Sequence, residues 1–197
     1  MASAGRGFRV CYDARVIVLG IDPGSRRCGY GVVAREGTRV RVVESGVLVP
    51  GNLPMPERLA RILEGLASVI GRSGPAEASI EQVFSGVSAR SALALGQARG
   101  VALAAAAQAG LPVFEYAPAE VKLAFTGNGR AGKEQMVRTA RTVLGVVAEL
   151  ADEADALALA MCHLARRTAR LALAPAVASR AAARLRPSRR DHRRAAP

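Results

Sequence analysis

Residues 16–25 read VIVLGIDPGS, and this stretch decides the fold of the chain. Residues 16–21 are apolar without a break and rich in β-branched side chains, which predicts a central strand buried on both faces. Asp22, Pro23 and Gly24 then end the strand in a turn. Because carboxylates are rarely buried without partners, Asp22 has two interpretations. It either hydrogen-bonds the backbone of its own turn or belongs to a functional site.

The pattern around this strand predicts an α/β chain. Residues 29–34 and 39–49 resemble strands, and with the first strand they predict a three-stranded antiparallel meander. The later elements are expected as a helix at 56–70, a strand at 78–83, a helix at 91–109, a strand at 112–116, and helices that begin at Pro118, near Met136 and near Asp152. This order favours a mixed five-stranded sheet flanked by helices. Gly96, Gly100 and Ala104 give the helix at 91–109 a nearly flat face, which allows close packing within the fold or across a dimer.

The length of 197 residues suits one domain with tails. We expect residues 1–15 to be a disordered extension, 16–167 to be the folded domain, and 168–197 to be a basic, disordered tail. The net charge of +12 indicates an anionic partner, with nucleic acid the first candidate and an anionic membrane surface the second. Ten arginines and one aspartate from Arg166 onward carry +9 of this charge. The tail either adds salt-sensitive DNA affinity or only aids solubility.

The cysteines and the apolar runs limit the cellular setting. Cys11, Cys28 and Cys162 are scattered and lack the close pairs of a zinc site or a disulfide framework, so we expect free thiols. No apolar run reaches the length of about eighteen residues that a membrane helix needs. The N-terminus also lacks the pattern of a signal peptide. The sequence therefore predicts a cytoplasmic protein.

Three further carboxylates are candidates for the same site as Asp22. Glu81 lies inside the apolar segment at 80–84, where it is either a solvent-facing residue of an edge strand or a functional residue. Asp152 and Asp155 open the last helix, where acidic side chains also cap helices and favour the helix dipole. Their i, i+3 spacing places them on one helical face. If the two strands are neighbours and the last helix packs across them, all four carboxylates converge.

Such a cluster would repel itself without cations. Oxygen ligands with no nearby Cys or His pair select Mg²⁺ or Mn²⁺ over zinc. Two ions about 4 Å apart could activate a water molecule and stabilise the departing 3′ oxygen in phosphodiester hydrolysis. The four carboxylates therefore predict a two-metal phosphodiesterase.

Five motifs in order resemble those of the RuvC family of crossover (Holliday) junction endodeoxyribonucleases, over roughly residues 16–165. They are GIDPGS at 20–25 with GYG at 29–31, IEQVF at 80–84, ALGQARG at 94–100, VFEY at 113–116 with VK at 121–122, and DEADA at 152–156. The resemblance implies a ribonuclease-H-like fold and a homodimer with two active sites. It also implies paired symmetric nicks across a four-way DNA junction in recombination and repair, and partnership with the RuvA and RuvB branch-migration proteins.

The resemblance assigns the family's catalytic and metal-binding positions to four carboxylates, Asp22, Glu81, Asp152 and Asp155. Some members carry His where Asp152 stands. Lys122 and Lys133 match basic positions near the scissile phosphate, and Phe84 matches an aromatic residue that stacks on junction bases. From the residues alone, both lysines could be solvated charges and Phe84 could belong to the core.

Three other functions fit parts of the pattern. A ribonuclease-H-like nuclease that acts on RNA also begins with an acidic first strand, although the loop at Phe84 and the GQARG segment at 96–100 disfavour it. A sugar-kinase-like or actin-like ATPase shares the Gly-Ile-Asp-x-Gly loop but needs two such domains, and this chain is too short. A junction-binding module without catalysis would only recruit a branch-migration motor. The four intact acidic positions argue against that module.

Overall fold

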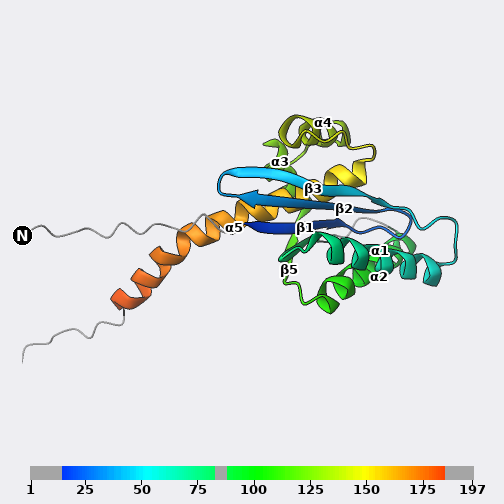
Figure 1. The fold of residues 1–197 in the computed structure, drawn as a ribbon, viewed down its shortest axis with the longest axis horizontal. Coiled ribbons are helices and arrows are strands. Elements are labelled where there is room, and N and C mark those ends of the chain that lie inside the picture. The colour runs from blue at the N-terminus through cyan, green and yellow to red at the C-terminus, as the bar shows by residue number, and fades with distance from the viewer. Residues whose placement is uncertain (1–14, 83–87, 185–197) are drawn as a thin grey trace, which may run out of the picture. The chain divides into compact units, whose positions relative to one another are not determined.

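Strands and helices follow one another in the predicted order. The computed structural model describes residues 15–82 and 88–184, and Figure 1 labels its elements. The strands are β1 (Val16–Asp22), β2 (Cys28–Glu36), β3 (Arg39–Leu48), β4 (Glu77–Glu81) and β5 (Val113–Tyr116). The helices are α1 (Met55–Ser73), α2 (Ala89–Gln108), α3 (Pro118–Thr126), α4 (Lys133–Leu144) and α5 (Ala151–Arg184).

The five strands form one mixed sheet in the order β3-β2-β1-β4-β5, so β1 lies at its centre. β1 pairs antiparallel with β2 and parallel with β4, while β2–β3 is antiparallel and β4–β5 is parallel. Val18 and Leu19 on β1 are both fully buried. Because adjacent side chains of a strand point to opposite faces, this burial confirms a central strand covered on both sides.

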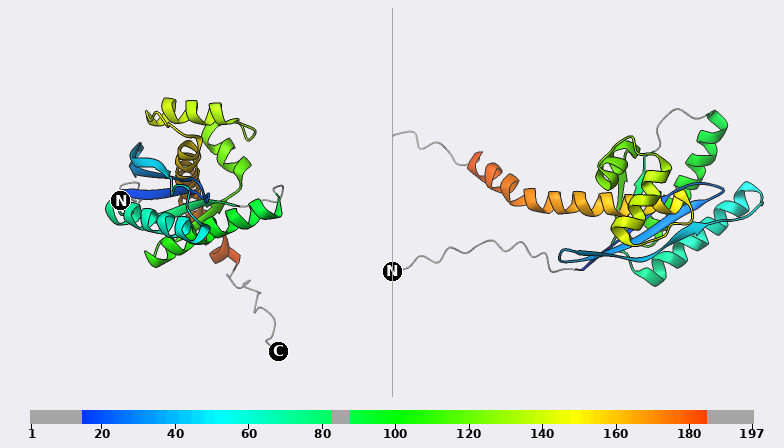
Figure 2. Two further views of the ribbon diagram at one scale, coloured as in Figure 1. Left: turned by 90° about the vertical axis from the view of Figure 1, so that its right-hand side faces the viewer. Right: turned by 90° about the horizontal axis from the view of Figure 1, so that it is seen from above.

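Helices cover both faces of the sheet (Figure 1). One face packs on α1 and α2 through an apolar core that includes Leu19, Ile21, Val32, Ile62, Leu66, Ile80 and Ala102. The other face packs on the first part of α5, through Val16, Val18, Val33, Leu157, Ala160 and Leu164. α3 and α4 lie on the outer side of α5, which is seen nearly end-on in the left panel of Figure 2, and they contribute Val121, Phe125, Met136 and Ala140 to a third cluster. The first part of α5 is therefore enclosed between the sheet and these two helices.

The helix ends follow the glycine and proline signals of the sequence. α1 ends at Gly74, which has a φ of 57°, and α3 ends at Gly127, which has a φ of 77°. Glycine adopts this left-handed conformation without strain and commonly ends helices. Pro118 stands in the first turn of α3, where its missing N–H group costs nothing.

Two features bear on the sequence expectations for α2 and for the C-terminal segment. The buried face of α2 consists of Ala98, Ala102, Ala105 and Ala106. A Cβ atom placed on Gly96 or Gly100 would meet no described atom within 4 Å, so the fold of this part of the chain does not use the flat face. Helix α5 also continues to Arg184, where we expected a tail without regular structure. The physical reason is that alanine and arginine, which dominate this segment, have high helix propensity.

The chain divides into two compact units, and the second begins at Arg166. The expected domain limits at residues 15 and 167 stay predictions. Within residues 15–82 and 88–184, no helix combines the length and the apolarity needed to cross a membrane.

Candidate active site

Asp22 and Glu81 end two neighbouring parallel strands. In the β1–β4 register Ile21 lies beside Ile80, so the next residue of each strand lies at the same edge of the sheet. Ile21 and Ile80 belong to the core beneath α1 and α2. Because side chains alternate along a strand, both carboxylates point to the opposite face, which α5 covers.

Glycines on β1 and β2 allow the backbone of α5 to approach this edge. A Cβ atom on Gly20 would collide with the carbonyl oxygen of Ala156, and a Cβ atom on Gly29 would collide with that of Asp152. Any larger residue at these two positions would push α5 away from the sheet. The close approach brings Asp152 and Asp155, in the first turns of α5, to the strand ends.

Asp22 has a strongly raised pKa. Its pKa increases from 3.8 to about 8, first because of burial and then because of the charges of Glu81, Asp155 and Asp152, while Lys133 lowers it. A carboxyl group in this environment is largely protonated at neutral pH unless a cation compensates its charge. The site therefore favours binding of a cation.

Two lysines lie within electrostatic reach of the carboxylates. Burial raises the pKa values of Glu81 and Asp155, and Lys122 acts against this effect at both groups. Lys133, the first residue of α4, lowers the pKa values of Asp22 and Asp155. The structure therefore places both sequence-predicted lysines beside the acidic cluster.

A cavity of about 100 Å³ lies between these side chains. Its lining consists of Asp22, Glu81, Pro118, Val121, Lys122, Met136, Asp155 and Leu159. Three of the four predicted carboxylates thus share one cavity. Asp152 is not part of the lining, although its charge contributes to the raised pKa of Asp22.

The carboxylates fit a hard divalent cation. Oxygen ligands are those that Mg²⁺ and Mn²⁺ prefer, and a cation would remove the repulsion that raises their pKa values. Among the residues that the structure describes, no three Asp, Glu, His or Cys side chains lie in a group that could hold a metal ion by themselves. An ion at these carboxylates would therefore need water or phosphate oxygens as further ligands, as Mg²⁺ usually has.

Sequence reasoning missed Glu153, which lies between the two aspartates of α5. The residue is only 8% exposed. It accepts a hydrogen bond from the Ser45 hydroxyl group at 2.6 Å and another from the backbone N–H of Glu149 at 3.2 Å. These bonds tie the start of α5 to β3 and to the preceding loop, which orients Asp152 and Asp155. An acidic residue in a first helical turn gave no separate signal, because the helix dipole already accounts for it.

Arg99 and the strand glycines were also missed as parts of the site. Arg99 on α2 forms an ion pair with Glu115 at 2.7 Å and donates a hydrogen bond to the backbone carbonyl of Glu81 at 3.4 Å. This contact supports the end of β4 and gives the ALGQARG motif a physical role. Gly20 and Gly29 did carry a signal, since glycine within a strand often marks close approach of another backbone.

The remaining candidates lie elsewhere or outside the described residues. Phe84 and Cys11 fall outside them. Cys28 and Cys162 are buried, and neither is part of a disulfide, as expected. Burial raises the pKa of Cys28 to about 12, so its thiol group stays protonated and unreactive.

The mixed sheet with flanking helices, and the carboxylates at its strand ends, define a ribonuclease-H-like nuclease that depends on a metal. The family model described as "Crossover junction endodeoxyribonuclease RuvC" matches residues 18–163. The chain therefore belongs to the RuvC family, in agreement with the five motifs of its sequence.

Curated relatives carry the same description. A crossover junction endodeoxyribonuclease RuvC of Anaeromyxobacter sp. (strain K) is 74% identical over 184 residues, which cover 90% of this chain and 98% of the relative. Another from Chloroflexus aggregans is 49% identical over 148 residues, which cover 74% of this chain and 90% of the relative.

Solved structures agree with the fold. "T. thermophilus RuvC in complex with Holliday junction substrate" matches with a TM-score of 0.70 and 36% identity, covering 76% of this chain and 93% of that one. The yeast mitochondrial Holliday junction resolvase Ydc2 matches with a TM-score of 0.54 over 74% of this chain and 76% of that one. At 16% identity, the second likeness supports the fold alone.

Proposed function

We propose that this chain is a structure-selective endonuclease that resolves four-way (Holliday) DNA junctions by paired symmetric nicks, in homologous recombination and DNA repair. The observation that supports this most strongly is the convergence of Asp22, Glu81 and Asp155 on one small cavity where β1, β4 and α5 meet. The T. thermophilus relative was solved with a Holliday junction substrate, which favours the same substrate here.

The proposed cofactors are two Mg²⁺ ions, for which Mn²⁺ can substitute. They would be held by Asp22, Glu81, Asp152 and Asp155. When bound, they would supply Lewis-acid chemistry that activates a water molecule and stabilises charge on the leaving 3′ oxygen. The carboxylates' own part is to hold these ions in a partly buried setting, where electrostatic interactions are stronger than in bulk water.

Lys122 and Lys133 are the proposed contacts to the scissile phosphate, and Phe84 is the proposed stacking residue. The proximity of both lysines to the carboxylates supports the first assignment. Phe84 rests on the family resemblance. Replacing either lysine by alanine should weaken binding to every DNA sequence alike. It should also reduce the slope of log Kd against the logarithm of the salt concentration by about one.

A Phe84→Leu variant should instead lose affinity for the junction and keep its affinity for linear duplex.

A homodimer with two active sites fits the requirement for paired nicks, because each nick needs its own site. The exposed Gly96 and Gly100 leave room for a neighbouring helix on α2, and this supports that face as the contact between two copies. Partnership with RuvA and RuvB, and a cytoplasmic location, belong to the same proposal and rest on the family.

A cleavage assay with three substrates tests the proposal. End-labelled four-way junction, linear duplex of the same sequence and an RNA/DNA hybrid are incubated with the protein in Mg²⁺, in Mn²⁺ and in EDTA. We expect symmetric nicks on the junction alone, in the presence of either metal. Preferential cutting of the hybrid would indicate a ribonuclease. Junction binding without cutting in either metal would indicate a recruitment module.

A further inference from the structure

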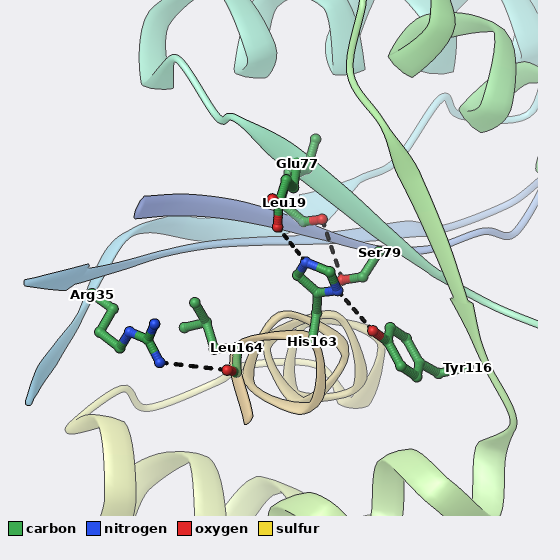
Figure 3. Close-up of polar contacts among 7 residues, drawn as sticks. All are labelled: Leu19, Arg35, Glu77, Ser79, Tyr116, His163 and Leu164. Atoms are coloured by element: carbon green, nitrogen blue, oxygen red, sulfur yellow. Dashed lines mark hydrogen bonds and ion pairs between the residues drawn. The ribbon is translucent and has the colours of Figure 1, made fainter. Parts of the chain in front are cut away.

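His163 on α5 lies at the centre of a buried polar network (Figure 3). Its side chain is 1% exposed. Its Nε2 lies 2.6 Å from a carboxylate oxygen of Glu77 at the start of β4, and its Nδ1 lies 2.7 Å from the hydroxyl group of Tyr116 at the end of β5. Because a carboxylate only accepts hydrogen bonds, Nε2 donates to Glu77. Nδ1 and the Tyr116 hydroxyl group share the second hydrogen bond, and the protonation state of the ring sets its direction. Phe114 packs against the imidazole with ring centroids 4.4 Å apart.

The two elements joined by Glu77 and His163 also carry two of the proposed metal ligands. Glu77 and Glu81 lie four residues apart on one face of β4, which is about 13 Å along a strand. Asp155 and His163 lie eight residues apart on α5, which is about 12 Å along a helix axis. Glu77, at the start of β4, contacts His163, which lies later on α5, and Glu81, at the end of β4, interacts electrostatically with Asp155, which lies earlier on α5. The first part of α5 therefore runs antiparallel to β4, and the distance between the two contacts is about the same along both elements. The first contact therefore sets the position of the second.

Tyr116 adds a second link between the network and the active site. It pairs with Glu81 in the β4–β5 register, and its carbonyl oxygen accepts a hydrogen bond from the N–H of Gln82 at 2.9 Å. Its hydroxyl group forms the hydrogen bond with His163. Sliding α5 by one residue would move His163 by about 1.5 Å and break both of its hydrogen bonds. Because buried polar groups without partners are costly, the network opposes such a slide.

We propose that the Glu77–His163–Tyr116 network fixes the register of α5 against β4 and so holds Asp155 opposite Glu81 at the spacing that a divalent ion needs. His163 is a positioning residue and does not contact the substrate. This inference rests on the proposed function, since it takes Glu81 and Asp155 as metal ligands.

The test measures Mn²⁺ binding to the DNA-free, full-length protein by electron paramagnetic resonance. Glu77→Ala removes the acceptor for Nε2, whereas Glu77→Gln keeps an oxygen in its place. Tyr116→Phe removes only the hydroxyl group. Tyr30→Phe is the matched control, because Tyr30 lies on β2 and packs on the core beneath α1 and α2. Circular dichroism at the assay temperature verifies that each variant is folded.

We expect Glu77→Ala and Tyr116→Phe to raise the Kd for Mn²⁺ about 10-fold, the usual size of an effect on a metal from a residue that orients its ligands. Glu77→Gln and Tyr30→Phe should stay within about 2-fold of the parent, because each keeps the network's hydrogen bonds. Junction affinity in EDTA should not change in any variant. Tyr116→Phe keeps the packing of the aromatic ring, so it tests the role of the network even if Glu77→Ala fails to fold.

Unchanged Mn²⁺ affinity in Tyr116→Phe would overturn the inference. An equal loss in Glu77→Gln and Glu77→Ala would also overturn it, because the buried charge and not the hydrogen bond would then be responsible. If the affinity changes as expected but the parent does not cut junctions, the network has the assigned role and the proposed function is wrong. If the parent binds no Mn²⁺, both are wrong.

Discussion

The two faces of the central sheet are built differently, although the same strands form both. Toward α1 and α2, the strands present apolar side chains such as Leu19, Ile21 and Ile80. Toward the strand ends beneath α5, they present Gly20, Asp22, Ser79 and Glu81. The first face stabilises the fold by burying apolar area. The second holds carboxylates whose charges are unfavourable until a cation compensates them.

Strand β1 contributes both to the stability of the fold and to the candidate active site. Ile21 and Asp22 are adjacent, and the alternation of the strand sends them to opposite faces. Substitutions on the α1–α2 face should therefore change stability and leave the chemistry intact. Conservative substitutions of the carboxylates on the α5 face should change the chemistry and leave the fold intact.

The largest expected effect is on the α5 face. Glu81→Gln removes a charged ligand with almost no change in shape, so junction cleavage should fall by about 10³-fold, equivalent to several kcal/mol of metal-ion stabilisation. Single-turnover cleavage rates in Mg²⁺ provide the measurement. Junction affinity in EDTA should match that of the parent, and a cleavage rate within a few-fold of the parent would remove Glu81 from the site.

A substitution that leaves a cavity on the α1–α2 face of the sheet should affect stability alone. Leu66 is fully buried against the sheet, so Leu66→Ala should lower the free energy of unfolding by about 3 kcal/mol. Urea denaturation measures this loss. Cleavage per folded molecule should stay at the parent level, and a large loss of cleavage in the folded variant would mean that the two faces are not independent.

The approach of α5 can be disturbed through a single methyl group. Gly20→Ala places a Cβ atom against the carbonyl oxygen of Ala156. We expect a loss of about 1–3 kcal/mol in stability, because the helix must move away. Cleavage should fall as well, since Asp155 moves with the helix. Gly71→Ala on α1 is the matched control: a Cβ atom there meets nothing within 4 Å, and alanine should slightly stabilise the helix.

A further prediction concerns pH in the metal-free protein. The pKa of Asp22 is about 8 in the fold and near 3.8 in the unfolded chain, so the folded state binds the extra proton. The stability that this provides is fully present below the unfolded pKa and is lost as pH rises through the folded pKa. The melting temperature in EDTA should therefore fall between about pH 5 and pH 8. Asp22→Asn should flatten this dependence, and an equally steep fall in that variant would assign it to other groups.

Much of the fold and of the acidic site could be predicted from the sequence. The apolar run at 16–21 and the helical spacing after Pro56 are strong periodic signals, and the glycines near 74 and 127 end helices for a simple conformational reason. Parallel pairing of the strands then places Asp22 and Glu81 at one edge. The i, i+3 spacing of Asp152 and Asp155 likewise predicted that both carboxylates lie on one face of the last helix.

Other parts of the site carry no local pattern. His163 stands among apolar residues of α5, and only the fold reveals that Glu77 and Tyr116 face it. Glu153 is hidden by the ordinary preference for acidic residues in a first helical turn. The continuation of α5 to Arg184 was missed because low complexity was taken as disorder, although alanine and arginine both favour helices.

The most direct test of the account is the cleavage of a four-way junction by Asp22→Asn, with its melting temperature in EDTA as the check on folding. Nicking should disappear while the melting temperature stays equal to that of the parent or rises, because the substitution removes a buried carboxyl group that its neighbours repel. Nicking near the parent rate, or loss of nicking together with a lower melting temperature, would contradict it.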